Sequence, residues 1–207
     1  MDFVGVELME GNIYYISDLH FQHFNIMRFD NRPFSSTEEM NSTLINNWNN
    51  KVTNKDRVFI LGDFCWGKEA DWLYFLPKLN GAKTLIKGNH DLRQMSTKCR
   101  SLFVDVKDYK EIKDKGRTVI MSHYPIMCYK HSYHDDTYML FGHVHNRTQE
   151  SLMVQEWIEY IKRNCTEPFH NKGQLYNVGC MMPWMNYTPQ TLDEIIENYG
   201  NYYGGKD

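Results

Sequence analysis

The chain alternates short apolar runs with clusters of polar residues and glycine. Six runs of four or five residues are rich in β-branched and aromatic side chains, and each ends in such a cluster: 12–16, 57–61, 83–86, 118–121, 138–141 and 175–178. Runs this short, bounded by turn residues, predict buried strands. One further run, 109–112, and the run at 117–120, which overlaps the one at 118–121, flank the sequence Lys-Asp-Lys-Gly at 113–116; this pattern predicts a β-hairpin.

Helical periodicity lies between some of these runs. Ser36 and Glu39 have the spacing of a capping box, and Met40, Leu44 and Trp48 follow at intervals of four. Three more helices are expected at 71–76, which stops at Pro77, at about 150–164, where Val154, Trp157, Ile158 and Ile161 share a face, and at 191–198. Trp48, Trp72 and Trp157 are therefore expected to be core residues.

These elements predict an α/β fold. Helices would cover either a mixed sheet or two stacked sheets. No repeat, low-complexity tract or linker interrupts the 207 residues, so a single domain is expected over 1–207, with its core at about 12–195. Residues 198–207 are expected to form either a tail or a contact.

Composition and charge exclude several classes of protein. Hydrophobic residues make up 42% of the chain and charged residues 24%, which is typical of a soluble globular protein. No apolar run approaches the ~20 residues that a membrane helix needs, and no secretory signal is recognisable at the start, so no membrane partner is expected. The net charge of −3 argues against a strongly basic nucleic-acid scaffold. Five cysteines without a CxxC pair indicate reduced thiols and a cytoplasmic protein.

Nearly every predicted strand is followed by an Asp, Asn or His. Asp18-x-His20 follows the first run, Gly-Asp ends at Asp63, Gly-Asn-His-Asp covers 88–91, Ser-His ends at His123, and Gly-His-x-His covers 142–145. Taken singly, most of these groups read equally well as turn residues beside a packing histidine. Together they indicate a shared site, because the carboxyl ends of strands form the ligand crevice of α/β folds. The mixed nitrogen and oxygen donors, without a thiolate, suit Mn, Fe or Zn.

These segments resemble the signature motifs of the calcineurin-like metallophosphoesterases over roughly residues 12–195. The first motif, which continues as His20-Phe21-x-His23-x-Asn25-Ile26, is most similar to small bacterial and phage members. The resemblance implies two stacked mixed sheets flanked by helices in a four-layer sandwich, with two divalent metal ions at the strand ends. Manganese is the expected metal, with Fe, Zn or Ni as alternatives.

The resemblance also assigns roles to individual residues. It implies that Asp18, His20 and His145 hold one metal, that Asn89, His123 and His143 hold the other, and that Asp63 bridges them. His90 corresponds to the catalytic histidine, which we expect to stabilise the transition state and protonate the leaving oxygen; the alternative is a further metal contact. Asp91 would either orient a histidine or cap a following helix.

Substrate contacts are predicted from a loop rich in arginine and phenylalanine at 21–34. Arg28 and Arg32 in this loop, and Arg93 beyond it, are candidates for binding phosphate, since a guanidinium can contact phosphate with two hydrogen bonds. His23 would either face the substrate phosphate or pack locally.

The expected activity is hydrolysis of a phosphate ester. A phosphodiester or nucleotide-type substrate, which includes a nucleic-acid end, is slightly favoured, and a phosphomonoesterase or protein phosphatase is the alternative. Two other classes remain: a non-catalytic metal-binding scaffold, which should have lost ligands, and a mononuclear zinc hydrolase, which would leave Asn89 without a role. Motif and fold do not name the substrate.

Overall fold

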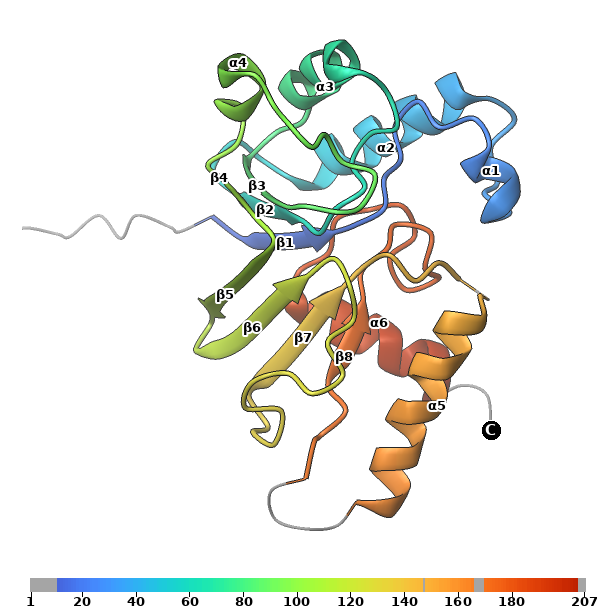
Figure 1. Cartoon of the computed structure of the whole chain (residues 1–207), viewed down its shortest axis with the longest axis vertical. Coiled ribbons are helices and arrows are strands. Elements are labelled where there is room, and N and C mark those ends of the chain that lie inside the picture. The colour runs from blue at the N-terminus through green and yellow to red at the C-terminus, as the bar shows by residue number, and fades with distance from the viewer. Residues whose placement is uncertain (1–10, 147, 166–169, 205–207) are drawn as a thin grey trace, which may run out of the picture.

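Figure 1 shows the computed structural model, which describes residues 11–146, 148–165 and 170–204. The strands are β1 (Ile13–Ile16), β2 (Arg57–Ile60), β3 (Ala82–Ile86), β4 (Asp105–Lys107), β5 (Tyr109–Asp114), β6 (Arg117–Ser122), β7 (Thr137–Phe141) and β8 (Leu175–Asn177). The helices are α1 (Ile26–Phe29), α2 (Thr37–Lys51), α3 (Glu69–Phe75), the short 3-10 helix η1 (Leu76–Lys78), α4 (Thr97–Arg100), α5 (Gln149–Asn164) and α6 (Leu192–Gly204).

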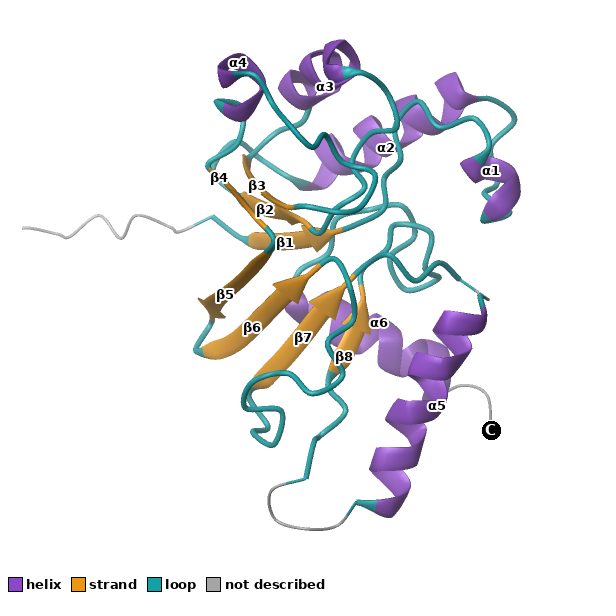
Figure 2. Ribbon diagram, in the orientation of Figure 1, coloured by secondary structure: helices purple, strands orange, loops and turns teal. Residues whose placement is uncertain are grey.

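The strands form two four-stranded sheets that pack face to face (Figure 2). The first has the order β1-β2-β3-β4 and is parallel throughout. The second has the order β5-β6-β7-β8 and is mixed, because the β5–β6 hairpin is antiparallel. All six predicted runs are strands. The second sheet is mixed, as the resemblance implied. The first sheet is parallel, because each of its strands is joined to the next by a crossover connection.

Helices cover the outer faces of both sheets, so the fold has four layers. Helices α2 to α4 lie over the first sheet, α1 lies beyond the end of β1, and α5 lies over the second sheet (Figure 2). One core cluster extends from the helices over the first sheet to the second sheet and includes Ile16, Leu85 and Leu140, all fully buried. A second cluster packs Ile158 of α5 against Phe141 of β7. The α/β sandwich expected from the sequence is thus the observed fold.

The predicted helical faces are buried as expected. Ser36 accepts a hydrogen bond from the backbone N–H of Glu39 at the start of α2, and Met40, Leu44 and Trp48 are fully buried. Trp72 of α3 is also fully buried, whereas Trp157 of α5 is only partly buried. All five cysteines are free, as the sequence predicts.

The last helix is longer than predicted. Residues 198–204 continue α6, so they form a contact and not a tail. Tyr199, Tyr202 and Tyr203 surround the buried ring of Trp184, with ring centroids 5.0, 5.5 and 5.9 Å away. Residues 205–207 lie outside the described part of the chain. None of the described helices combines the length and apolar character that crossing a membrane requires.

Candidate metal centre

The seven predicted metal ligands come from the carboxyl ends of five strands. Asp18 and His20 follow β1, Asp63 follows β2, Asn89 follows β3, His123 follows β6, and His143 and His145 follow β7. These ends belong to both sheets and meet along one rim of the sandwich (Figure 1). Parallel pairing aligns the strand ends within each sheet. The packing of the two sheets then brings together residues more than 100 positions apart, such as Asp18 and His145.

The backbone at this rim is strained. Asp18, His20, Asp63 and His143 have φ angles of 54°, 50°, 51° and 65°, in the left-handed region that residues other than glycine seldom adopt. Such conformations cost on the order of 1–3 kcal/mol each and concentrate at functional sites. Four of the seven predicted ligands are therefore held in a costly backbone conformation.

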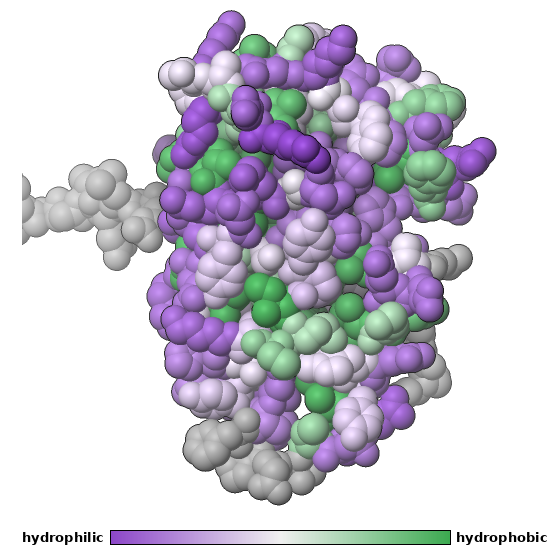
Figure 3. Space-filling model, viewed as in Figure 1, coloured by the Kyte–Doolittle hydropathy of each residue, from purple (hydrophilic) through white to green (hydrophobic). Residues whose placement is uncertain are grey.

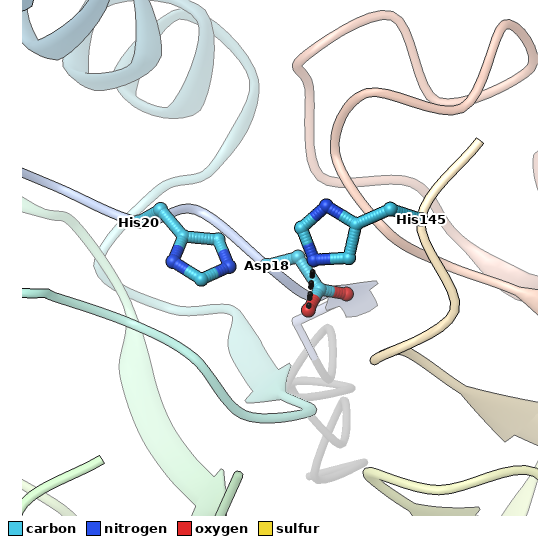
Figure 4. Close-up of side chains that lie close together, drawn as sticks. All are labelled: Asp18, His20 and His145. Atoms are coloured by element: carbon cyan, nitrogen blue, oxygen red, sulfur yellow. Dashed lines mark ion pairs between the residues drawn. The ribbon is translucent and has the colours of Figure 1, made fainter. Parts of the chain in front are cut away.

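Asp18, His20 and His145 form a first group of donors. One ligand atom from each lies within 4.8 Å of the others. His20 and His145 flank the Asp18 carboxylate, and Nε2 of His145 lies 3.7 Å from Oδ1 of Asp18 (Figure 4). This is the set that the resemblance to the metallophosphoesterases implies for one metal.

Asp63 lies between the first group and a second one. Its Oδ2 is 3.6 Å from Nε2 of His20, and its Oδ1 is 3.6 Å from Nε2 of His123. Asp18, Asp63 and His123 form the second set of donor atoms within 4.8 Å of one another. One carboxylate thus presents an oxygen to each side, which is the geometry that a bridging ligand needs.

Asn89 and His143 complete the second side. Oδ1 of Asn89 lies 3.0 Å from Nε2 of His123. The imidazole rings of His123 and His143 are 5.1 Å apart between centroids, and the backbone N–H of His143 donates to both oxygens of Asp18. All seven predicted ligands therefore come together at this rim.

Hydrogen bonds fix which ring nitrogen faces the centre. The Nδ1 atom of His123 donates to the carbonyl oxygen of Leu61 at 2.7 Å. The Nδ1 atom of His145 donates to Oδ1 of Asp30 at 2.5 Å. In this tautomer the Nε2 lone pairs are free. The Nε2 of His123 and the Oδ1 of Asn89 then face each other as two acceptors 3.0 Å apart, an arrangement that a cation between them would stabilise.

His20 supplies the clearest sign of a missing partner. Its Nε2 atom is fully buried and has no hydrogen-bond partner, which is costly for a polar atom. Its Nδ1 atom is 3.3 Å from Nδ1 of His23. Burial lowers the pKa of His20 well below the ordinary value, so the ring stays neutral with a lone pair available. Neutral imidazole, amide and carboxylate donors fit divalent transition metals.

His145 is tied to a residue that the sequence did not indicate. Burial alone would lower its pKa, but the hydrogen bond with Asp30 and the charge of Asp18 raise it. Asp30 lies beyond α1 and is itself held by Arg32, at 2.8 Å. A carboxylate on the far nitrogen of a metal-binding histidine orients the ring and increases its basicity.

We expect Asp30→Asn to weaken metal binding by about 10- to 100-fold, because the negative charge behind His145 is lost while the side-chain volume is kept. Titration of the metal-free protein with Mn²⁺ measures the effect. Asp108→Asn, at a carboxylate that is 83% exposed, is the matched control. Equal affinity in the wild type and in Asp30→Asn would show that Asp30 does not support the ligand.

His90 lies beside the first group of donors. Its backbone N–H donates to Oδ1 of Asp63 at 3.0 Å, and its ring lies 5.8 Å from the ring of His20. The side chain is exposed, so it borders the metal centre without being enclosed by it. Trp66, whose centroid is 4.7 Å away, contacts the ring from one side.

Asp91 has neither of the two roles predicted for it. No helix begins after it, since α4 starts at Thr97, and its carboxylate binds no histidine ring. It accepts hydrogen bonds from the backbone N–H groups of Asp63, Phe64 and Gly88. Burial raises its pKa to about 6. The residue therefore joins the loops after β2 and β3, which carry Asp63 and Asn89.

The predicted substrate contacts divide into two exposed and two buried residues. Arg28 and Arg93 are exposed and stay candidates. His23 is 7% exposed and stacks on Trp66 with a centroid distance of 4.0 Å, so it packs locally. Arg32 is 4% exposed and donates to the carbonyl oxygens of Asp18 and Leu19. The prediction that Arg32 contacts substrate is wrong in this structure, because its guanidinium is enclosed behind the β1 loop.

Arg28, in α1, and Arg32, which follows α1, should respond differently to substitution. Arg32→Met removes the guanidinium beside the Asp30 carboxylate, which then keeps only the hydrogen bond from His145, and we expect a loss of about 3–5 kcal/mol in the free energy of unfolding. Arg28→Met, at an exposed position of α1, should change it by no more than about 0.5 kcal/mol. Urea denaturation of both variants measures the difference, and equal stabilities would refute the structural role of Arg32.

Three residues near the centre were not predicted from the sequence. Asp30 lies between two arginines and looked like a loop residue, while Trp66 and Tyr124 follow Asp63 and His123 within three positions. The ring of Tyr124 lies 4.6 Å from that of His143. For Trp66 and Tyr124 the one available signal was that they lie near a motif in the sequence. That signal does not show whether a side chain lines the site or packs in the interior.

A sandwich of two sheets with a rim of aspartate, asparagine and histidine donors defines a metallophosphoesterase-type protein. The profile of the calcineurin-like phosphoesterase family matches residues 11–203, and the chain belongs to this family. An uncharacterised protein of Methanocaldococcus jannaschii is 36% identical over 188 residues, which cover 89% of each chain. The crystal structure of a protein of unknown function from Aquifex aeolicus is similar, with a TM-score of 0.64 and 26% identity, over 90% of this chain and 98% of that one.

Proposed function

We propose that this protein is a phosphoesterase that depends on a pair of divalent metal ions. Membership of the family implies a phosphoester hydrolase. The observation that carries the binuclear proposal is the position of Asp63, whose two oxygens lie 3.6 Å from Nε2 of His20 on one side and from Nε2 of His123 on the other. A mononuclear site would leave one of these contacts and the Asn89 amide without a purpose.

The residues divide into two ligand sets. One metal would be held by Asp18, His20 and His145, the other by Asn89, His123 and His143, and Asp63 would belong to both. When bound, two such ions supply Lewis acidity for an anionic phosphoryl group and acidify a water molecule. The neutral amide of Asn89 contributes a ligand oxygen without adding negative charge, which leaves the site favourable for an anion. Manganese is the proposed metal, with Fe, Zn or Ni as alternatives.

His90 is proposed to hold and deliver a proton. Its ring lies at the exposed edge of the first ligand set, where a leaving oxygen can be reached from solvent. Trp66 limits the directions in which the ring can turn. Protonation of an alkoxide or phenoxide leaving group by this imidazole avoids release of a strong base.

The preferred substrate is a phosphodiester or a nucleotide-type ester, including a nucleic-acid end. Asn89, His90 and the arginines at 28 and 93 are exposed, so the rim is accessible to a group larger than a phosphate monoanion. A phosphomonoesterase or protein phosphatase is the alternative activity. A non-catalytic scaffold is disfavoured, because each of the predicted ligands is present at the rim.

Hydrolysis of two p-nitrophenyl esters tests the proposal. The protein is treated with a chelator, reconstituted with Mn²⁺, and assayed with bis-p-nitrophenyl phosphate and p-nitrophenyl phosphate. We expect metal-dependent turnover of at least one ester, with the diester preferred. Turnover that survives chelation, or metal binding without turnover of either ester, would contradict a metal-dependent hydrolase of this breadth.

A further inference from the structure

A hollow of about 500 Å³ lies between α5 and the loop that follows β6. Its walls are formed chiefly by Tyr124, Met127, Met153, Val154 and Trp157, and we call it the Trp157 pocket. Apolar residues gather on the lower half of the face shown in Figure 3, where Figure 1 places β6 and α5. The volume is several times that of a phosphate group and suits a ring system.

The Trp157 pocket is continuous with the metal centre. His143, a predicted metal ligand, also lines the pocket. Its neighbour in space is Tyr124, whose ring lies 4.6 Å from that of His143 and 5.2 Å from that of His123. A molecule bound by the donors of the rim therefore has one direction in which it can extend past His143 along an apolar wall.

Two large side chains of the pocket wall are exposed to solvent and are not buried in the core. The side chain of Met153 is 61% exposed and that of Tyr124 is 48% exposed. Large apolar side chains that are exposed together beside a candidate site commonly mark a ligand surface. Trp157 is different, since one side of it packs against the core cluster beneath α5.

The charge of the pocket selects against a second anion. Its lining includes the carboxylate of Glu150 and neither a lysine nor an arginine. A phosphate or carboxylate group would be repelled there, whereas an uncharged ring would bury apolar surface against Trp157 and Tyr124. Contacts between aromatic rings favour binding beyond the apolar area that they bury.

We propose that the Trp157 pocket binds the organic part of the substrate, and that this part carries an uncharged aromatic ring. The inference rests on the proposed function, because the phosphoryl group is placed at the metal centre and the ring in the adjoining pocket. It deepens that function by naming the class of ester: an aryl or nucleobase-bearing phosphate is selected over a small alkyl phosphate.

Binding of two phosphonates to the Mn²⁺-reconstituted protein tests the pocket without turnover. Phenylphosphonate and methylphosphonate share an anionic head group that hydrolysis does not remove, and they differ in the ring. By calorimetry we expect phenylphosphonate to bind at least about tenfold more tightly, since a ring leaves water. Equal affinities, or no binding of either phosphonate at millimolar concentration, would overturn the proposal.

Substitutions in the wall of the Trp157 pocket test whether this pocket causes the preference for phenylphosphonate over methylphosphonate. Met153→Ala and Trp157→Ala should each reduce the preference for phenylphosphonate about threefold or more, with the affinity for methylphosphonate unchanged. Met153 is exposed, so its variant is expected to fold even if the loss of Trp157 unfolds α5. Tyr160→Ala is the matched control, since Tyr160 is a 62% exposed aromatic residue of α5 outside the pocket. An undiminished preference in Met153→Ala, or a loss in Tyr160→Ala of the same size, would place the ring elsewhere.

The parallel ester assay separates the two proposals. If p-nitrophenyl esters are hydrolysed and the phosphonates bind equally, the pocket is wrong and the phosphoesterase stands. If phenylphosphonate is preferred through Met153 and neither ester is hydrolysed, the pocket stands and the catalytic proposal is wrong.

Discussion

Asp63→Asn should abolish the binuclear centre and lower the rate of ester hydrolysis by at least about a hundredfold. The substitution keeps the shape of the side chain but replaces one of the two oxygens that face His20 and His123 with an NH₂ group. An amide nitrogen is not a ligand for divalent metals, and the loss of charge weakens both sides at once. Metal content after dialysis and kcat for p-nitrophenyl esters measure the two effects.

A distant carboxylate provides the comparison for Asp63. Asp135→Asn removes a charge of the same sign from a side chain that is 91% exposed and paired with Lys172. We expect its metal content and kcat to match those of the wild type. Full metal content together with an unchanged kcat in Asp63→Asn would remove Asp63 from the centre.

His90→Ala should lose rate and keep metal. The ring of His90 lies beside the first ligand set, but its contact with Asp63 is made by the backbone N–H, which alanine retains. Loss of a general acid costs about 10²- to 10⁴-fold in rate. The loss should be larger for an ester with a poor leaving group, such as a methyl phosphate diester, than for a p-nitrophenyl ester, whose leaving oxygen needs little protonation.

The dependence on the leaving group distinguishes proton transfer from metal binding. A His90→Ala protein that has lost metal would support the alternative, in which His90 is a further metal contact. His134→Ala is the control, because His134 is an exposed histidine outside the rim. Equal rate losses for good and poor leaving groups, with full metal content, would count against the general-acid role.

The architecture was largely predictable because its strands are short, apolar and buried. The runs at 57–61 and 138–141 are clear in the sequence since both faces of these strands are covered. Strand β4, Asp105–Lys107, was missed because three residues with two charged side chains carry no alternation. The pairing was also beyond the sequence: a parallel first sheet and a mixed second sheet follow from crossovers that periodicity does not specify.

The rim could be predicted for a different reason. Polar residues such as Asp18 and His143 follow apolar strands directly, and parallel strands collect their carboxyl ends at one edge. Side chains whose function depends on burial could not be assigned in this way. Arg32 has the composition of a phosphate contact but is enclosed behind the β1 loop, and Asp91 binds backbone N–H groups. Their partners are set by tertiary packing, which local sequence does not encode.

The number of metal ions bound per chain is the most direct test of the account. The protein would be stripped with a chelator, titrated with Mn²⁺ to saturation, separated from free metal, and analysed for manganese and protein by elemental analysis. The structure predicts two ions per chain in the wild type, since Asp63 faces one donor set through each of its oxygens. A saturating value of one ion or none would contradict the binuclear centre, and with it the assignment of Asn89, His123 and His143 as a second ligand set.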